Sequence, residues 1–190
     1  MRHVRKRRLL ATFGLVAAAA VVLVGVASGQ PIDSGSFHDE GTFVDDDFCG
    51  TGLTVEGEFV VDGRFMVAAR GRDGLIYFME HVRATSVLTN PDTNRSVTVV
   101  SKVLNKDLKV TDNDDGTLTV LFMATGNDVI YGSDGKAIGR NPGQIRIEFL
   151  IDHNGTPDDP FDDEVIAEEV VKGSTGRSDD FCEVVLPAIT

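Results

Sequence analysis

Tyr77, His81 and Arg83 are the residues whose types and spacing best suit ligand binding. Even numbers of positions separate them in the β-prone run 75–88, so a strand would place them on one face. A phenol, an imidazole that titrates near neutral pH and a guanidinium that holds carboxylates form a ligand site when apolar groups surround them. We therefore predict a site there if this face looks into a barrel. The alternative is a face in water, with Arg83 paired to a surface carboxylate.

A second candidate is the acidic loop 152–164, because calcium prefers hard oxygen ligands carried on loops. Its possible ligands are Asp152, Asn154, Asp158, Asp162 and Asp163. The spacing does not match an EF-hand loop, and Asp and Asn also populate turns for local hydrogen-bonding reasons. The sequence therefore favours a solvated turn over a calcium site, and it predicts no cofactor.

Catalytic patterns are weak throughout. No Gly-x-Ser-x-Gly motif occurs, and His38, His81 and His153 lack the spacing of zinc ligands. Pairs of carboxylates carry no information in a chain with 30 acidic residues. Whether the protein is an enzyme stays open, and the sequence leans towards a non-catalytic role.

The first 27 residues have the order of a secretory signal peptide. A basic start is followed by the apolar run 9–26 and by small residues at Gly25-Val26-Ala27. We predict cleavage there and a secreted protein without membrane attachment. The alternative is an uncleaved segment that anchors the protein to the membrane. The formal net charge of −12 argues against nucleic acid or anionic lipid as partner.

The two cysteines are expected to form a disulfide, because exported proteins keep such bonds oxidised. Cys49 and Cys182 each end an Asp-Asp-Phe-Cys sequence, one near the start and one near the end of the predicted domain. We predict that their bridge ties the first strand to the last.

Alternating apolar residues separated by Gly, Asn, Asp and Pro predict about nine or ten short strands and no long helix. Residues 28–41 are predicted to be a flexible leader, and residues 42–190 a single domain. Within it, Asp62-Gly63 and Asn141-Pro142-Gly143 are expected to be turns, and Phe181 to Leu186 the last strand. The predicted fold is an antiparallel, closed or nearly closed β-barrel, with a two-sheet β-sandwich as the alternative.

Short phrases over most of the predicted domain resemble a family of small exported proteins from actinobacteria. They include Gly71-Arg72-Asp73-Gly74, Asp115-Gly116-Thr117-Leu118, Ala124-Thr125-Gly126-Asn127, Asn141-Pro142-Gly143-Gln144-Ile145-Arg146 and Asp180-Phe181-Cys182. The resemblance implies export and a single domain, and it implies no activity. The expected barrel is similar in architecture to allene-oxide-cyclase and lipocalin barrels, and that analogy implies no chemistry.

Three functions are compatible with these features. The one we favour is an exported binding module without catalysis, for a small apolar ligand or a protein. The second is a cofactor-independent isomerase or cyclase with its site inside the barrel. The third is a structural or cell-surface protein that has no small-molecule site.

Overall fold

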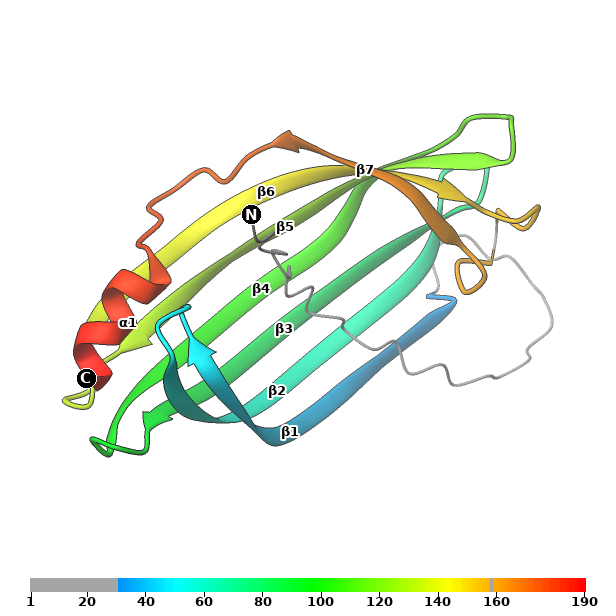
Figure 1. The fold of residues 1–190 in the computed structure, drawn as a ribbon. Coiled ribbons are helices and arrows are strands. Elements are labelled where there is room, and N and C mark those ends of the chain that lie inside the picture. Colours follow the sequence, from blue (N-terminus) through cyan, green and yellow to red (C-terminus); the bar gives the residue numbers. More distant parts are fainter. Residues whose placement is uncertain (1–30, 158) are drawn as a thin grey trace, which may run out of the picture.

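The computed structural model describes residues 31–157 and 159–190, which are mostly strand. Seven strands each pair antiparallel with the next, in the order β1-β2-β3-β4-β5-β6-β7 (Figure 1). Their bounds are β1 Asp33–Phe48, β2 Leu53–Arg70, β3 Leu75–Asn90, β4 Arg95–Asp112, β5 Thr117–Tyr131, β6 Ala137–Asp152 and β7 Glu164–Lys172. Within the described ranges there is one helix, α1 (Phe181–Ile189). The prediction of an antiparallel all-β fold is confirmed, whereas the predicted signal peptide lies outside the described residues.

The sheet is not closed, so the prediction of a closed barrel is wrong, whereas the described strands fit an open barrel or the alternative β-sandwich. Strands β1 and β7 are its two edges and do not pair with each other. Figure 1 shows the sheet curving around a concave face, with α1 at one end of that face. Closure would need β7 to continue the curve, but β7 has nine residues and two register shifts against β6. Such irregularities bend a strand and interrupt regular pairing.

The strands are longer and fewer than the sequence predicts, because several expected turns lie inside them. Asp62 and Gly63 are in the middle of β2, where Gly63 pairs with Phe37 of β1. Asn141-Pro142-Gly143 likewise lies within β6. A glycine in a strand is ambiguous from sequence alone, since it serves either a turn or the close approach of a neighbouring side chain.

Phenylalanines of β1 and β2 explain the strand glycines. Phe37 lies over Gly63 and Phe43 lies over Gly57, and in each case a methyl group added to the glycine would collide with the ring. Phe59 and Phe65 cover the β1 glycines in the same way. Such cross-strand pairs protect the glycine backbone and fix the register.

The predicted flexible leader is wrong for most of its length. Residues from Asp33 onward form β1, which pairs along β2 from Asp33 opposite Val67 to Phe48 opposite Leu53. The Gly, Ser and Asp residues that suggested a leader are compatible with an exposed edge strand, where charge and small side chains discourage further pairing.

The predicted last strand, Phe181 to Leu186, is instead the start of α1. Asp180 is the N-cap, and its carboxylate accepts a hydrogen bond from the Glu183 N–H at 2.9 Å. Val185 and Ile189, four residues apart, share one helix face and are fully buried. They pack with Phe48, Val55, Leu88, Val97 and Ile130 at one end of the concave face.

The predicted disulfide is confirmed, although its second cysteine lies in a helix rather than a strand. Cys49 follows β1, and Cys182 is in the first turn of α1, with 5.8 Å between their Cα atoms. The bond therefore holds α1 over the core cluster at the end of the sheet. Among the described residues, no helix is long and apolar enough to cross a membrane.

The C-terminal end of α1 is held by the turn between β3 and β4. Asn90, only 2% exposed, donates a hydrogen bond from Nδ2 to the Ile189 carbonyl at 3.1 Å. Thr93 donates its hydroxyl to the same carbonyl at 2.6 Å. These bonds satisfy a carbonyl at the helix end that has no partner within the helix.

Replacing Asn90 is expected to weaken this end of the molecule. Asn90→Ala should lower the free energy of unfolding by about 1–3 kcal/mol, because it removes a buried amide and its hydrogen bonds. Urea unfolding of the variant and of Asp92→Ala, an exposed residue of the same turn, measures the effect. An equal loss in both variants would contradict the assigned role.

Candidate functional site

A groove of about 1100 Å³ crosses the sheet from β1 to β5, and we call it the basic groove. Its lining residues come from the middle of five neighbouring strands. They are Ser36, Phe37, His38, Asp62, Gly63, Arg64, His81, Val82, Arg83, Lys102, Val103, Leu104, Thr125 and Gly126.

The strand register builds the groove from two parallel rows of side chains. One row contains His38, Asp62, Arg83 and Lys102, which lie opposite one another on β1 to β4. The second row lies two residues further along each strand and includes Arg64 paired with His81. Residues between the rows point to the other face and contribute backbone to the groove floor.

The groove lies on the convex face, opposite α1. Phe37, Val82 and Val103, which alternate with the two rows, belong to the same face as the residues that contact α1. Side chains of adjacent strand residues point to opposite faces, so the two rows must point away from α1.

Three side chains make the groove positively charged. Arg64, Arg83 and Lys102 are all exposed. None of them has a carboxylate within 4.0 Å among the described residues, where the ion pairs involve His38, Lys136 and Arg177. A chain with net charge −12 thus keeps three cations together without acidic partners.

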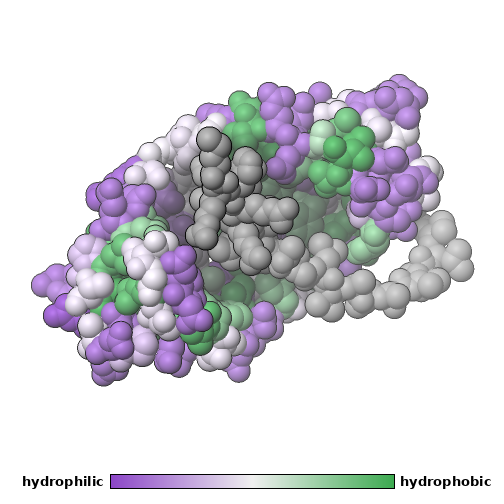
Figure 2. Space-filling model, in the orientation of Figure 1, coloured by the Kyte–Doolittle hydropathy of each residue, from purple (hydrophilic) through white to green (hydrophobic). Residues whose placement is uncertain are grey.

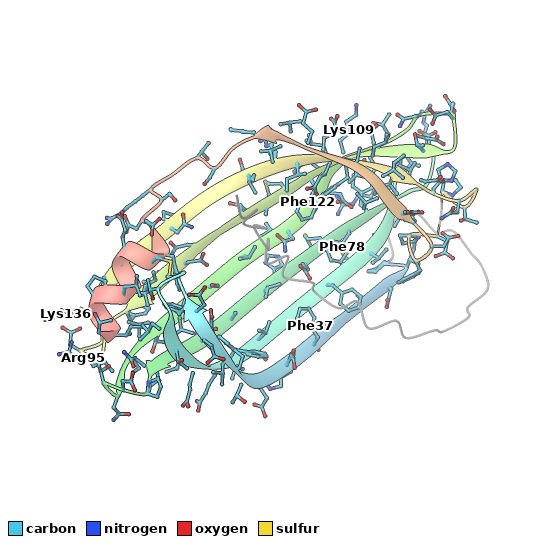
Figure 3. The ribbon with its side chains drawn as sticks, viewed as in Figure 1. Phe37, Phe78, Arg95, Lys109, Phe122 and Lys136 are labelled. Carbon is cyan, nitrogen blue, oxygen red and sulfur yellow. A yellow bond between two sulfur atoms is a disulfide. The ribbon has the colours of Figure 1, made fainter. Side chains whose placement is uncertain are left out.

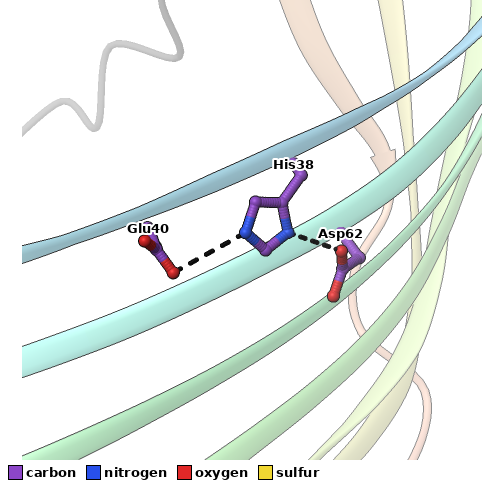
Figure 4. A network of polar contacts seen from close by, with 3 residues as sticks. All are labelled: His38, Glu40 and Asp62. Carbon is purple, nitrogen blue, oxygen red and sulfur yellow. Dashed lines mark hydrogen bonds and ion pairs between the residues drawn. The ribbon is translucent and has the colours of Figure 1, made fainter.

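His38 and Asp62 form the one ion pair inside the groove. His38 Nδ1 lies 2.8 Å from an Asp62 oxygen, and Nε2 lies 3.7 Å from Glu40, as Figure 4 shows. Both contacts favour the imidazolium, and the hydrogen bond with Asp62 is the largest cause of the raised pKa of His38. Asp62 is the one acid among the described residues that line the groove, and it is paired with His38, so the remaining charge there is positive.

Of the three predicted ligand residues, the structure brings two into the groove. His81 and Arg83 line it, whereas Tyr77 lies further along β3, next to the place where β3 and β4 separate. There the Val110 N–H donates to the Tyr77 hydroxyl at 3.1 Å, and the Arg70 guanidinium lies 5.1 Å from the ring centre. Tyr77 therefore satisfies a backbone donor where the strand ladder is interrupted.

Asp107 likewise satisfies a backbone N–H at this junction, in this case one of β3. Its carboxylate accepts a hydrogen bond from the Phe78 N–H at 2.7 Å. Burial raises the pKa of Asp107 to about 6, while the Phe78 bond and the Arg70 charge act in the opposite direction. This carboxyl does not line the groove, and its raised pKa follows from burial.

The acidic loop uses its polar groups internally. Asn154 donates to the Asp162 carbonyl, and Thr156 donates to the Asp162 carboxylate at 2.8 Å. Burial and the neighbouring Asp162 raise the pKa of Asp163. Over 31–157 and 159–190, no three His, Cys, Asp or Glu side chains are close enough to hold a metal ion. Asp158 lies outside these residues.

Sequence reasoning missed Arg64, Lys102 and the His38–Asp62 pair as parts of a site. They come from three different strands and share no motif. Only the cross-strand register, with Asp62 between His38 and Arg83, shows that they lie side by side. Correct strand ends would have been the one signal able to reveal it.

No family model, curated protein or solved structure matches this chain.

Proposed function

We propose that this protein is a non-catalytic binding module whose basic groove holds an anionic ligand. The observation that carries the proposal is the grouping of Arg64, Arg83 and Lys102 in one open groove without acidic partners. Guanidinium and ammonium groups that are not engaged within the protein are suitable donors for carboxylate, phosphate or sulfate oxygens.

The shape of the groove favours an extended ligand with several charges. Neighbouring strands lie about 4.8 Å apart, so the cations of β2, β3 and β4 follow one another across the sheet at about the strand spacing. A ligand with two or three anionic groups would contact these basic side chains one after another. An apolar molecule would leave these charges unpaired, which makes the basic groove a poor site for the apolar ligand that the sequence suggested.

Export is also part of the proposal. The Cys49–Cys182 disulfide suits an oxidising compartment, and the N-terminal pattern of charge and apolar residues suits secretion. An anionic ligand would then be met outside the cytoplasm.

Tripolyphosphate is a suitable probe because it carries several charges on a short chain. We expect saturable binding by isothermal titration calorimetry at low ionic strength, weakened by added NaCl. Arg83→Ala/Lys102→Ala should weaken binding about tenfold, because two exposed ion pairs contribute roughly 0.7 kcal/mol each.

The matched control removes two charges elsewhere. Arg95 and Lys136 lie near α1, away from the groove (Figure 3), so Arg95→Ala/Lys136→Ala should bind tripolyphosphate as the unchanged protein does. Equal losses in the two double variants, or no saturable binding at all, would refute an anion site in the groove.

A further inference from the structure

The concave side of the sheet carries a second surface, which we call the phenylalanine face. Its members are Phe37, Phe43, Phe59, Phe65, Phe78, Phe122 and Phe149. By register all seven share the face on which α1 packs, and Figure 3 shows Phe37, Phe78 and Phe122 on three different strands of it. Phe37 and Phe43 are 37% and 42% exposed.

Only one end of this face is covered by a described element. Val185 and Ile189 of α1 pack near Leu88 and Val97, where β3 ends and β4 begins. The rest of the concave face has no helix or second sheet over it within 31–157 and 159–190. Figure 2 shows apolar atoms in the hollow on this side.

The two faces of the sheet differ sharply in charge. Ten lysines and arginines lie in the seven strands, and the register places nine of them on the convex face. The exception is Arg95, at the α1 end. Carboxylates do occur on the concave face, among them Glu80 and Asp128, so this face is apolar and acidic.

The acids of the concave face are not equivalent. Glu80 accepts a hydrogen bond from Asn105 at 2.8 Å, and Asp107 accepts one from the Phe78 backbone. Asp128 is half-buried on β5 and forms neither a side-chain hydrogen bond nor an ion pair with any described residue. A partly buried carboxylate without a partner is unfavourable, so it suits a cationic group brought by a ligand.

The strand register gives the neighbours of Asp128 on the concave face. Ser101 lies directly opposite on β4, Ala84 comes next on β3, and Asn141 lies opposite on β6. These side chains are small or polar. The next row on the same face lies two residues further along each strand. It contains Phe37, Val82 and Val103, so apolar surface begins there.

We propose that the phenylalanine face binds a cationic amphiphile, with its positive head at Asp128 and its apolar chain along the phenylalanine rings. A second copy of the chain is a poorer occupant, because two concave faces meet only at their rims. Two such acidic faces would also repel each other. This site is independent of the basic groove, which lies on the opposite side of the sheet.

The test compares two amphiphiles that share a dodecyl chain, both below their critical micelle concentrations. By isothermal titration calorimetry, dodecyltrimethylammonium should bind the full protein about fivefold more tightly than dodecyl maltoside, because one ion pair with Asp128 contributes roughly 1 kcal/mol. Asp128→Asn should abolish this difference and leave the affinity for the maltoside unchanged.

Two further variants test the position of the chain. Phe37→Ala should weaken both amphiphiles about threefold through lost apolar contact, while Val60→Ala, 39% exposed on the convex side of β2, should change neither. Glu58→Gln, an exposed convex acid, is the charge control. Equal affinities for the two amphiphiles in the unchanged protein, absent binding of both, or a head-group preference that survives Asp128→Asn would overturn the proposal.

Discussion

Reduction of the Cys49–Cys182 disulfide is expected to lower the free energy of unfolding by about 2 kcal/mol. The bond joins residues 133 positions apart, and restricting so long a loop in the unfolded chain contributes roughly 4–5 kcal/mol in the chain-entropy treatment. Residual structure in the unfolded state reduces this contribution, so we expect about half.

Urea unfolding with and without a thiol reductant measures this loss. The double variant Cys49→Ser/Cys182→Ser should unfold at the same urea concentration as the reduced protein, and reductant should not affect it. Val185 and Ile189 remain packed against the sheet in the folded, reduced protein, so a native-like circular dichroism spectrum is expected before unfolding. An unchanged midpoint after complete reduction would show that the loop adds no stability.

Asp107→Asn is expected to stabilise the protein at neutral pH. The pKa of Asp107 is raised from 3.8 to about 6 in the folded protein, first of all by burial. The folded state therefore binds this proton more tightly than the unfolded state does. The resulting stability is fully present below pH 3.8 and is lost as the pH rises through about 6. Above that, the loss amounts to about 3 kcal/mol at most.

The amide in Asp107→Asn stays neutral at every pH and can still accept the Phe78 hydrogen bond. Relative to the unchanged protein, we expect a gain of about 2 kcal/mol above pH 7 and little difference near pH 4. Asp163, whose pKa is also raised by burial, contributes a slope of the same sign in both proteins. Thermal and urea unfolding across this pH range measures the difference.

A useful control is an aspartate shifted the other way. The backbone and side chain of Lys136 lower the pKa of exposed Asp134, so Asp134→Asn should not stabilise the protein at neutral pH. If Asp107→Asn showed the same pH dependence as the unchanged protein, the burial of that carboxyl would not control stability.

Features that depend on nearby residues could be predicted from the sequence. In β6, the spacing of Ile145, Ile147, Phe149 and Ile151 is enough to place them on one face, because side chains in any strand alternate whatever the strand pairs with. The disulfide was also predictable, since only one intramolecular pairing exists for two cysteines. Absence of a long amphipathic pattern correctly indicated an all-β protein.

Features that depend on distant partners were decided by the tertiary structure. Gly63 has the local properties of a turn, yet Phe37 of the neighbouring strand covers it and lets β2 continue. The segment from Phe181 has apolar residues that suit a strand, yet the strand residues that pack against Val185 and Ile189 favour a helix. In both cases, a partner far away in sequence outweighs weak local preference.

The candidate sites follow the same division. The face shared by His81 and Arg83 could be predicted from their spacing on one strand, whereas their neighbours Arg64 and Lys102 depend on how β2, β3 and β4 align. In the sequence, nothing distinguishes Asp128 from the other acids among the 30. Only the register places it on the concave face beside Ser101. A shift of one residue moves every side chain to the opposite face, so the sheet pairing decides which charges meet.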